Sequence, residues 1–589
     1  MSVRSGAEPA EAVMAPRDGT VPGLAISRLV SLVREHTAIA VFAIATVWGL
    51  VVTWPVAIHF GDYIYGTPGD ATGAVSTFWW WGYALTHGKP VLDNTLQGVP
   101  IGSEWDLIAF SPLSVFIFTP LDLVMGPIAS YNVLILSSFP LTAWATYLLA
   151  RALGISRLGA AFAGLALAFI PYHIEKATGH GNQTHLELLA GMLLFLVRWR
   201  QTGRRRNLVG AGVLAGLQAW LEPSVFYVMA FALLTFFAVS AALPEQGRSR
   251  RAWIGHHLVG GVLMAAVVAP FIPVALVFFH RPGSSSSLSS HLTHAQTSGE
   301  ALIYSARLRE YFEPWYANPL VPDAIKHLEF LRLHGSNFVE SSLALGYTVL
   351  ALAVTAVAWH RRRFVIALCL GLMFVGVLVS LPPDQKVGPF VVHPPTYYLT
   401  QVVTIFRVYA RFAMMVQLGV CLLAGLGLAG LQARLGGGRR QFLLAIPFLL
   451  MAVEFNNLPP THVTQILPAP AEYVWLRDQP QGVVMEYPAK AGGETLQQEI
   501  QIRQDLLYQM VHLHPTFLTE VTNGKVGAAA KELEPYYGAG VADRLKGYGV
   551  KYVLVHRGDY VAYGYDVPHD VPGLTYVTTL DGTDIFTVN

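Results

Sequence analysis

Two aspartates lie among turn-forming residues just after the first long apolar run of the chain. Asp62 and Asp70 fall in the segment HFGDYIYGTPGD, residues 59–70, whose glycines and proline favour turns. Carboxylates placed there lie at the membrane surface, hydrated but shielded. The aromatic run after Asp70 is too short and interrupted to span a bilayer, so we expect a helix lying in the interface. We predict that this loop forms the floor of a catalytic cavity, with Asp70 as its most important residue.

A second set of polar side chains lies in the segment PYHIEKATGHGNQTHLEL, residues 171–188. Ionisable residues so close to the membrane are costly, and the usual reason to keep them is a site. Three interpretations stay open: a zinc site on two of the histidines, a hydrated interhelical loop, or a substrate site with a basic face suited to phosphate. The five-residue spacing of His180 and His185 matches no standard zinc pattern. The side chains concerned are His173, Glu175, Lys176, His180, Asn182, Gln183 and His185.

Two arginines, Arg407 and Arg411, stand apart from the other basic clusters, in the segment TIFRVYARFAMM. They are four residues apart and therefore lie on one face of a helix. Two guanidinium groups there could bind a phosphate in a bidentate manner, or they could extend toward lipid headgroups. Single acids occur at Glu104, Glu222 and Glu313, and each is either a solvated carboxylate or a contact for substrate.

The elements that must position these residues are membrane helices. Of the 589 residues, 53% are hydrophobic and only 13% are charged, and the mean hydropathy is +0.45. A typical soluble domain is about one quarter charged, so the composition indicates a polytopic α-helical membrane protein. The formal net charge of +2 gives no indication of a nucleic-acid partner. Cys369 and Cys421 both lie in apolar runs, and their spacing offers neither a metal site nor a redox pair.

Eleven apolar runs are close to the length of about 20 residues that a membrane-spanning helix needs, although some are short. We therefore predict about 11 transmembrane helices. The runs are 36–58, 129–150, 157–173, 185–199, 207–222, 224–243, 254–279, 340–359, 363–381, 409–432 and 441–456.

Arginine clusters orient these helices, because cytoplasmic loops carry an excess of basic residues. With residues 1–35 as a disordered cytoplasmic tail, each cluster falls on the cytoplasmic side of the plasma membrane. The run 108–125 would reverse this pattern if it crossed, and it contains Pro112, Pro120 and Asp122. We therefore predict a re-entrant or surface helix there. The outer segments are 59–128, 174–184, 280–339, 382–408 and 457–589.

Two of these outer segments, 280–339 and 457–589, have a distinctive composition. The loop 280–339 begins with a flexible serine-rich tract and becomes aromatic at YFEPWYANP, which is typical of a lid. The tail 457–589 reads as a small extracytoplasmic α/β domain. We expect strands at 482–487 and 551–556 and a hairpin turn at Asp581-Gly582. No catalytic constellation is recognisable in this tail.

Several stretches together resemble the GT-C class of integral membrane glycosyltransferases, and most closely its uncharacterised bacterial members. They are GDATGAVSTFWWWGYALTHG, FSPLSVFIFTPLDLVMGPIASYN, AFIPYHIEKATGHGNQ, ESSLALGY and FRVYARF. The resemblance implies a polyprenyl-phosphate sugar as donor. It also implies that Asp70 is the first-loop acid that acts as base or as a metal-associated residue. The cofactor stays open, with Mg²⁺ or Mn²⁺ as candidates, since the next outer loop reads GHGNQTH where several families have a second Asp.

The expected reaction is inverting transfer of the sugar to an extracytoplasmic glycan, lipid or protein. A lipid phosphate is an activated leaving group, so the enzyme must hold that phosphate with cations, deprotonate a hydroxyl and exclude water. Asp70 is the expected base. The alternative is a transporter or a non-catalytic lipid-handling protein, although internal repeats and paired broken helices are not evident. The residues expected to bind substrate are Arg407, Arg411, Lys176, His180, Asn182, Glu104 and Glu313.

Overall fold

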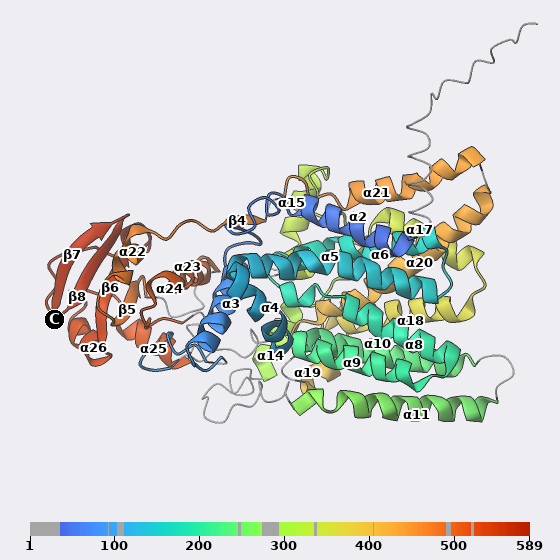
Figure 1. The fold of residues 1–589 in the computed structure, drawn as a ribbon, viewed down its shortest axis with the longest axis horizontal. Helices are drawn as coiled ribbons and strands as arrows, with labels where there is room; N and C mark the ends of the chain where they lie inside the picture. Colours follow the sequence, from blue (N-terminus) through green and yellow to red (C-terminus); the bar gives the residue numbers. More distant parts are fainter. Residues whose placement is uncertain are drawn as a thin grey trace, which may run out of the picture.

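A computed structural model describes residues 36–589 except 92, 103–110, 245–248, 274–293, 335–337, 404, 405, 437, 461, 490–495 and 520–523. The predicted tail 1–35, the serine-rich tract at 283–290 and Glu104 therefore lie outside the described residues. Figure 1 shows a helical bundle joined to a smaller unit that contains a four-stranded sheet.

Each of the eleven apolar runs contains a helix of the bundle. Five helical stretches of the described chain are long and apolar enough to cross a membrane: Pro127–Ala152, Pro223–Ala242, Arg250–Val268, Arg363–Ser380 and Tyr409–Leu435. The fold is therefore that of a polytopic membrane protein, while the number of eleven spans stays a prediction. The helices are α2 (Thr37–Val52), α5 (Pro127–Ala152), α6 (Arg157–Phe169), α8 (Glu187–Thr202), α9 (Arg205–Leu221), α10 (Pro223–Ala242), α11 (Arg250–Val268), α17 (Tyr347–Trp359), α18 (Arg363–Ser380), α20 (Ala413–Leu435) and α21 (Ile446–Glu454).

Helix α20 lies at the centre of the bundle and is buried along most of its length, between α6, α17 and α18. Glycines allow this close approach. A Cβ atom at Gly425 would lie 2.4 Å from the carbonyl oxygen of Gly159 on α6, and one at Gly427 would lie 1.9 Å from that of Leu352 on α17. Backbones at such separations leave no room for any side chain.

The first outer loop folds into two helices, α3 (Asp70–Thr86) and α4 (Pro112–Met125). Helix α3 was predicted to lie in the membrane interface, but much of its aromatic surface packs inside the protein. Trp80 and Trp81 are buried, and the Phe78 ring stacks on Phe118 of α4. Helix α4 has 14 residues, or about 21 Å, and is shorter than the hydrocarbon core of about 30 Å. Its partial insertion stays a prediction.

Shorter elements connect these helices, most of them at the end of the bundle that carries the predicted outer loops. A two-stranded ladder pairs β1 (Tyr63–Tyr65) with β4 (Val463–Gln465), which ties the first loop to the start of the tail. The remaining elements are α7 (Pro171–Lys176), η2 (Gly181–Gln183), α14 (His294–Ile303), η3 (Leu308–Tyr311), α15 (Asp323–Leu331), α16 (Phe338–Ser341), β2 (Gln385–Val387), β3 (Phe390–Val392), α19 (Pro395–Val402), η4 (Tyr409–Phe412) and η5 (Gly438–Ala445).

The tail forms a mixed sheet in the order β5-β6-β8-β7. Strands β5 (Val483–Tyr487) and β6 (Val550–His556) are parallel and agree with the predicted strands. Strands β7 (Leu574–Leu580) and β8 (Thr583–Val588) form the predicted hairpin. Its turn has φ values of 44° at Asp581 and 84° at Gly582, the positive pair that a tight primed turn requires. The helices are α22 (Ala471–Arg477), α23 (Leu496–Leu507), α24 (Gln509–His512), α25 (Gly524–Glu532), α26 (Val541–Gly547) and α27 (Arg557–Ala562).

The tail docks on the first outer loop through backbone groups. The Thr516 amide donates to the Leu96 carbonyl at 2.7 Å, and the Val99 amide donates to the Thr516 carbonyl at 3.0 Å. The Gln509 side chain donates to the Leu96 carbonyl at 2.8 Å. Helix α23 also packs against α3. The beginning of α3 therefore lies between the bundle and the tail (Figure 1).

The close approach of α20 and α17 predicts a penalty for any side chain at Gly427. We expect Gly427→Ala to lower the free energy of unfolding by about 1–3 kcal/mol, because the added methyl group must displace the α17 backbone. The measurement is thermal unfolding of the detergent-purified protein. The matched control is Gly255→Ala on α11, where a Cβ atom meets no described atom within 4 Å. An equal loss in both variants would contradict the packing argument.

Candidate functional site

Asp70 is the first residue of α3 and follows the positive-φ residue Gly69. The amide of Gly69 donates to the Thr72 hydroxyl, and that hydroxyl donates to the Gly69 carbonyl, both at 3.0 Å. This exchange fixes the start of the helix, whose N-terminal dipole favours a carboxylate. The side chain of Asp70 is 49% exposed, although the surrounding segments are buried. A Cβ atom at Gly179 would lie 3.1 Å from that of Asp70, so a glycine at residue 179 lets the loop after α7 lie close to Asp70 without displacing it.

Two basic side chains face the two oxygens of Asp70. The Arg503 guanidinium on α23 donates to Oδ1 at 2.5 Å, and His180 Nε2 lies 3.7 Å from Oδ2. Partial burial raises the pKa of Asp70, but His180, Arg503 and Lys176 more than offset this effect, so the pKa lies below its usual value. Asp70 is therefore an ionised carboxylate at neutral pH.

Behind Asp70 lies a buried ion network centred on Glu340 of α16. Its Oε1 bonds Lys176 of α7 and lies 3.3 Å from Nε of Arg411, while its Oε2 accepts from the Tyr172 hydroxyl at 2.7 Å. Burial alone would raise the pKa of Glu340, but Lys176 and Arg411 lower it to about 2. Burial lowers the pKa of Lys176 to about 8, so this ammonium group stays charged at neutral pH.

A second carboxylate completes this network. Arg411 donates to the Ser224 hydroxyl at 2.6 Å and lies 3.8 Å from Glu222, which in turn accepts from Ser224. The network thus joins two cations, Lys176 and Arg411, to two carboxylates, Glu222 and Glu340. The positive charges of both cations are already balanced.

Glu175, the neighbour of Lys176, is also buried but has no described cationic partner within ion-pair distance other than His462 at 4.0 Å. The Trp315 indole donates to Oε1 at 3.0 Å and the Tyr316 hydroxyl donates to Oε2 at 3.1 Å. Burial raises the pKa of Glu175 to about 7, although the two hydrogen bonds oppose the rise. These contacts fasten the loop 280–339 to α7.

The other predicted site residues lie outside this group. Arg407 pairs with Glu300 at 3.0 Å, and Asn182 accepts from the Ser114 hydroxyl at 2.9 Å. Glu313 lies 3.2 Å from Arg332 and lines a cavity of about 330 Å³ in the loop 280–339. Glu104 lies outside the described residues. The structure therefore brings together Asp70, His180, Lys176 and Arg411 among the predicted residues.

Three residues of the group were not among the predicted site residues. The sequence around Arg503 does not indicate a site, because Arg503 lies on a polar helix 433 positions from Asp70. It contacts Asp70 only through docking of the tail. Glu222 was named only as a single acid. Glu340 opens the segment ESSLALGY, which was noted for its resemblance rather than for its carboxylate.

The donor set around Asp70 does not fit Mg²⁺ or Mn²⁺. These ions favour several oxygen ligands, whereas the Asp70 oxygens face a guanidinium and an imidazole. A zinc site on His180 and His185 finds no support, because His185 uses its two nitrogens toward Glu187 at 2.7 Å and the Leu134 carbonyl at 3.2 Å.

Comparisons with solved structures identify the fold. The mycobacterial arabinofuranosyltransferase AftD matches 94% of this chain with a TM-score of 0.55 and 15% identity, and the chain spans 40% of its length. The oligosaccharyltransferase of Archaeoglobus fulgidus matches 92% of this chain with a TM-score of 0.50 and 14% identity, over 73% of its own length. Both are GT-C glycosyltransferases, so the resemblance in the sequence is confirmed at the level of the fold.

A search of curated proteins finds no match. A family model does match, over residues 38–455, which include the helices of the bundle and the residues that surround Asp70 apart from Arg503. Its description is "Domain of unknown function (DUF6311)". Since the match covers well over half of the 589 residues, the chain belongs to the DUF6311 family.

Proposed function

We propose that this protein is an inverting membrane glycosyltransferase that moves a sugar from a polyprenyl-phosphate donor to an extracytoplasmic acceptor hydroxyl. The observation that carries the proposal is the ionised, half-exposed carboxylate of Asp70, which faces the cationic Arg503 beside a buried network of charges. The names of the two similar structures, an arabinofuranosyltransferase and an oligosaccharyltransferase, support sugar transfer as the reaction class.

Asp70 is the general base of this proposal. One of its oxygens accepts the proton of the acceptor hydroxyl while the acceptor oxygen forms a bond to the anomeric carbon. The bond between that carbon and the phosphate oxygen breaks, and the polyprenyl phosphate leaves with the electron pair. A single displacement of this kind inverts the anomeric centre.

Arg503 is the proposed phosphate ligand. The Arg503 side chain is 20% exposed, whereas that of Arg411 is 13% exposed and already bonded to Glu340 and Ser224. A guanidinium matches the geometry of a phosphate. Binding of the donor phosphate would therefore draw Arg503 from Asp70 and free the carboxylate for the acceptor. Lys176 lies behind this site, where Glu340 balances its charge and holds it in place.

The cavity in the loop 280–339 is the proposed position of the acceptor. Its volume of about 330 Å³ is at the lower end of the range for small-ligand sites. It is lined by the aromatic residues Trp315, Tyr316, Phe330 and Phe338 and by the predicted substrate contact Glu313. Trp315 and Tyr316 also hold Glu175, so this cavity adjoins the segment that carries Lys176 and His180. In this proposal the tail and the loop lie on the extracytoplasmic side of the plasma membrane, and the N-terminus is cytoplasmic.

Replacing Asp70 by Asn removes the proposed base while keeping the shape of the side chain. We expect transfer to fall by at least about 100-fold, the usual contribution of a general base. The measurement is release of polyprenyl phosphate from a panel of radiolabelled polyprenyl-phosphate hexoses and pentoses, with purified protein and membrane extract as the source of acceptor. Asp62→Asn, in the same loop but paired only with His59, is the control. Normal turnover in Asp70→Asn would refute the assignment, and donor binding without turnover in the wild type would favour a lipid-handling protein.

Replacing Arg503 by Ala tests the phosphate ligand separately. We expect KM for the donor to rise by about 10- to 100-fold, because a hydrogen bond to a charged group contributes about 1.5–3 kcal/mol. Arg503→Lys should recover part of the loss, since Lys keeps the charge but not the paired donors. Arg477→Ala, an exposed arginine of the same tail, serves as control. An unchanged KM for the donor in Arg503→Ala would exclude this role.

The raised pKa of Glu175 predicts a pH dependence of stability. Because the pKa lies above that of the unfolded chain, the stabilising contribution is present below about pH 4.5 and is lost as the pH rises through about 7. Glu175→Gln mimics the protonated form. We expect its free energy of unfolding to exceed that of the wild type by less than about 1 kcal/mol at pH 5 and by up to about 3 kcal/mol at pH 8.

The measurement is the thermal unfolding temperature of both proteins at the two pH values, since other titrating groups cancel in the difference. Glu340→Gln is a control with the opposite expected effect on stability. It leaves Lys176 and Arg411 without their shared carboxylate and should destabilise the protein by about 3–5 kcal/mol at both pH values. A constant difference between Glu175→Gln and the wild type would show that Glu175 does not titrate in this range.

A further inference from the structure

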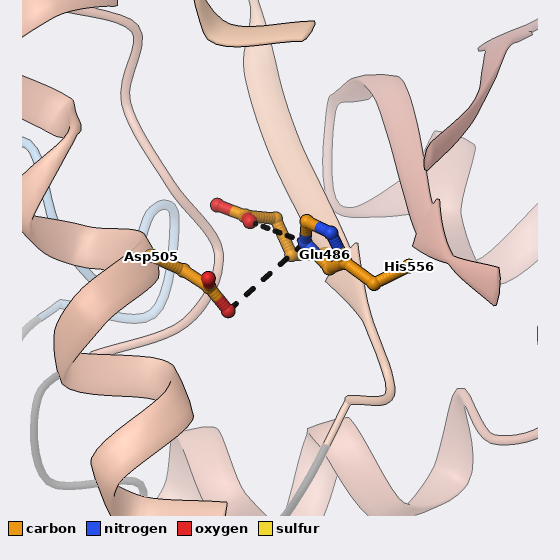
Figure 2. A group of neighbouring side chains, drawn as sticks. All are labelled: Glu486, Asp505 and His556. Atoms are coloured by element: carbon orange, nitrogen blue, oxygen red, sulfur yellow. Dashed lines mark hydrogen bonds and ion pairs between the residues drawn. The ribbon is translucent and has the colours of Figure 1, made fainter. Parts of the chain in front are cut away.

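Three potential metal ligands converge in the tail (Figure 2). Glu486 lies on β5, His556 at the end of the neighbouring parallel strand β6, and Asp505 on α23, which faces them. His556 Nε2 lies 3.0 Å from Glu486 Oε2 and 4.0 Å from Asp505 Oδ2. The three ligand atoms all lie within 4.8 Å of one another.

Hydrogen bonds on the far side of the imidazole orient it toward the carboxylates. The Thr583 hydroxyl donates to Glu472 Oε1 at 3.1 Å, so it accepts from Nδ1 of His556 at 3.0 Å. Nδ1 therefore carries a proton, and Nε2 faces the two carboxylates. Histidines that bind metals usually have such a second partner, which fixes the ring and the tautomer.

A buried carboxylate oxygen without a described hydrogen-bond partner lies on Glu472, a residue that is connected to this cluster through Thr583. Glu472 is 4% exposed, and its Oε2 has no hydrogen-bond partner among the described residues. Its carboxylate reaches the cluster through Thr583, and Glu472 and His556 line the same groove of about 650 Å³. Of the three cluster residues, His556 lines this groove. A buried carboxylate oxygen without a partner is costly, and a cation would satisfy it.

We propose that Glu486, Asp505 and His556 bind a divalent transition-metal ion, preferably Zn²⁺, with Glu472 as a neighbouring third carboxylate. Zinc accepts imidazole nitrogen and carboxylate oxygen at about 2.0–2.2 Å, which separates tetrahedral ligands by about 3.4 Å. The distances from His556 Nε2 to the carboxylate oxygens of Glu486 and Asp505, 3.0 and 4.0 Å, lie on either side of this value. The imidazole ligand favours Zn²⁺ over Mg²⁺ and Ca²⁺, which prefer oxygen ligands.

A proton is the competing occupant. Burial lowers the pKa of His556, but Asp505 and Glu486 raise it to about 9, so a charged imidazole could also balance the carboxylates. A measurement of bound metal distinguishes the two occupants. A metal ion would be retained through purification in a fixed ratio, whereas the protonated pair would bind no metal.

The test measures metal in the full-length protein, purified in detergent with a tag that contains no histidine. We expect about one zinc per chain by elemental mass spectrometry, and saturable binding of added Zn²⁺ after removal of the metal with a chelator. We expect His556→Ala to lose the stoichiometric zinc. Thr583→Val should weaken binding by about 10- to 100-fold, because it removes the acceptor for Nδ1 but no ligand.

The matched control is His393→Ala, in which the lost histidine pairs with a single carboxylate, Asp384, at 2.9 Å. It should keep the zinc. Should His556→Ala fail to fold, as judged by circular dichroism and gel filtration, Asp505→Asn replaces it. The proposal is overturned if the wild type neither contains nor binds zinc, or if a folded ligand variant keeps it. Because sugar transfer is not the readout, these outcomes are independent of the proposed function.

Discussion

Glu340 holds two cations from different parts of the chain in one buried place, and the end of the bundle that carries Asp70 depends on this ion pairing. Lys176 comes from the loop after α6, and Arg411 comes from the start of the central helix. An unbalanced charge at this depth would be strongly destabilising, at about 3–5 kcal/mol for the loss of one partner. Glu340 directly follows the loop 280–339, so the end of this loop must stay in contact with both segments.

This balance explains why Asp70 differs from the acids behind it. Glu222 and Glu340 are buried and neutralise Lys176 and Arg411, so their contacts serve to hold segments together. Asp70 is half-exposed at the start of a helix, and its strongest partner comes from the tail. A carboxylate in this position stays ionised and can exchange partners, which a fully enclosed acid cannot do without a large loss of solvation.

Hydropathy predicts most of the bundle, because a helix that contacts lipid needs a continuous apolar run. All eleven runs contain helices, and the primed turn at Asp581 and Gly582 follows from the conformational preference of its residue pair. Burial of the Trp80 and Trp81 side chains inside the protein was not predictable. Their aromatic character suits a membrane interface and a protein interior equally well, and the docked tail and α4 decide between them.

The candidate site was predictable only where its residues are neighbours in sequence. His180 and Lys176 share a short loop, and Asp70 follows the first apolar run, so local context was sufficient for each. Arg503 and the cluster of Glu486, Asp505 and His556 depend on tertiary contacts between separate elements. Their spacing in the sequence matches no motif, because a sheet and a packed helix, rather than one loop, bring them together.

The family match ends at residue 455, whereas the strongest partner of Asp70 lies beyond it at Arg503. An alignment of homologues over the matched region alone would therefore include Asp70 but leave out Arg503. Natural recombination at that boundary would separate Asp70 from Arg503. A chimaera with another tail would regain this ion pair only if the new tail placed a cation next to the first turn of α3. Classification of relatives by reaction should therefore use whole chains.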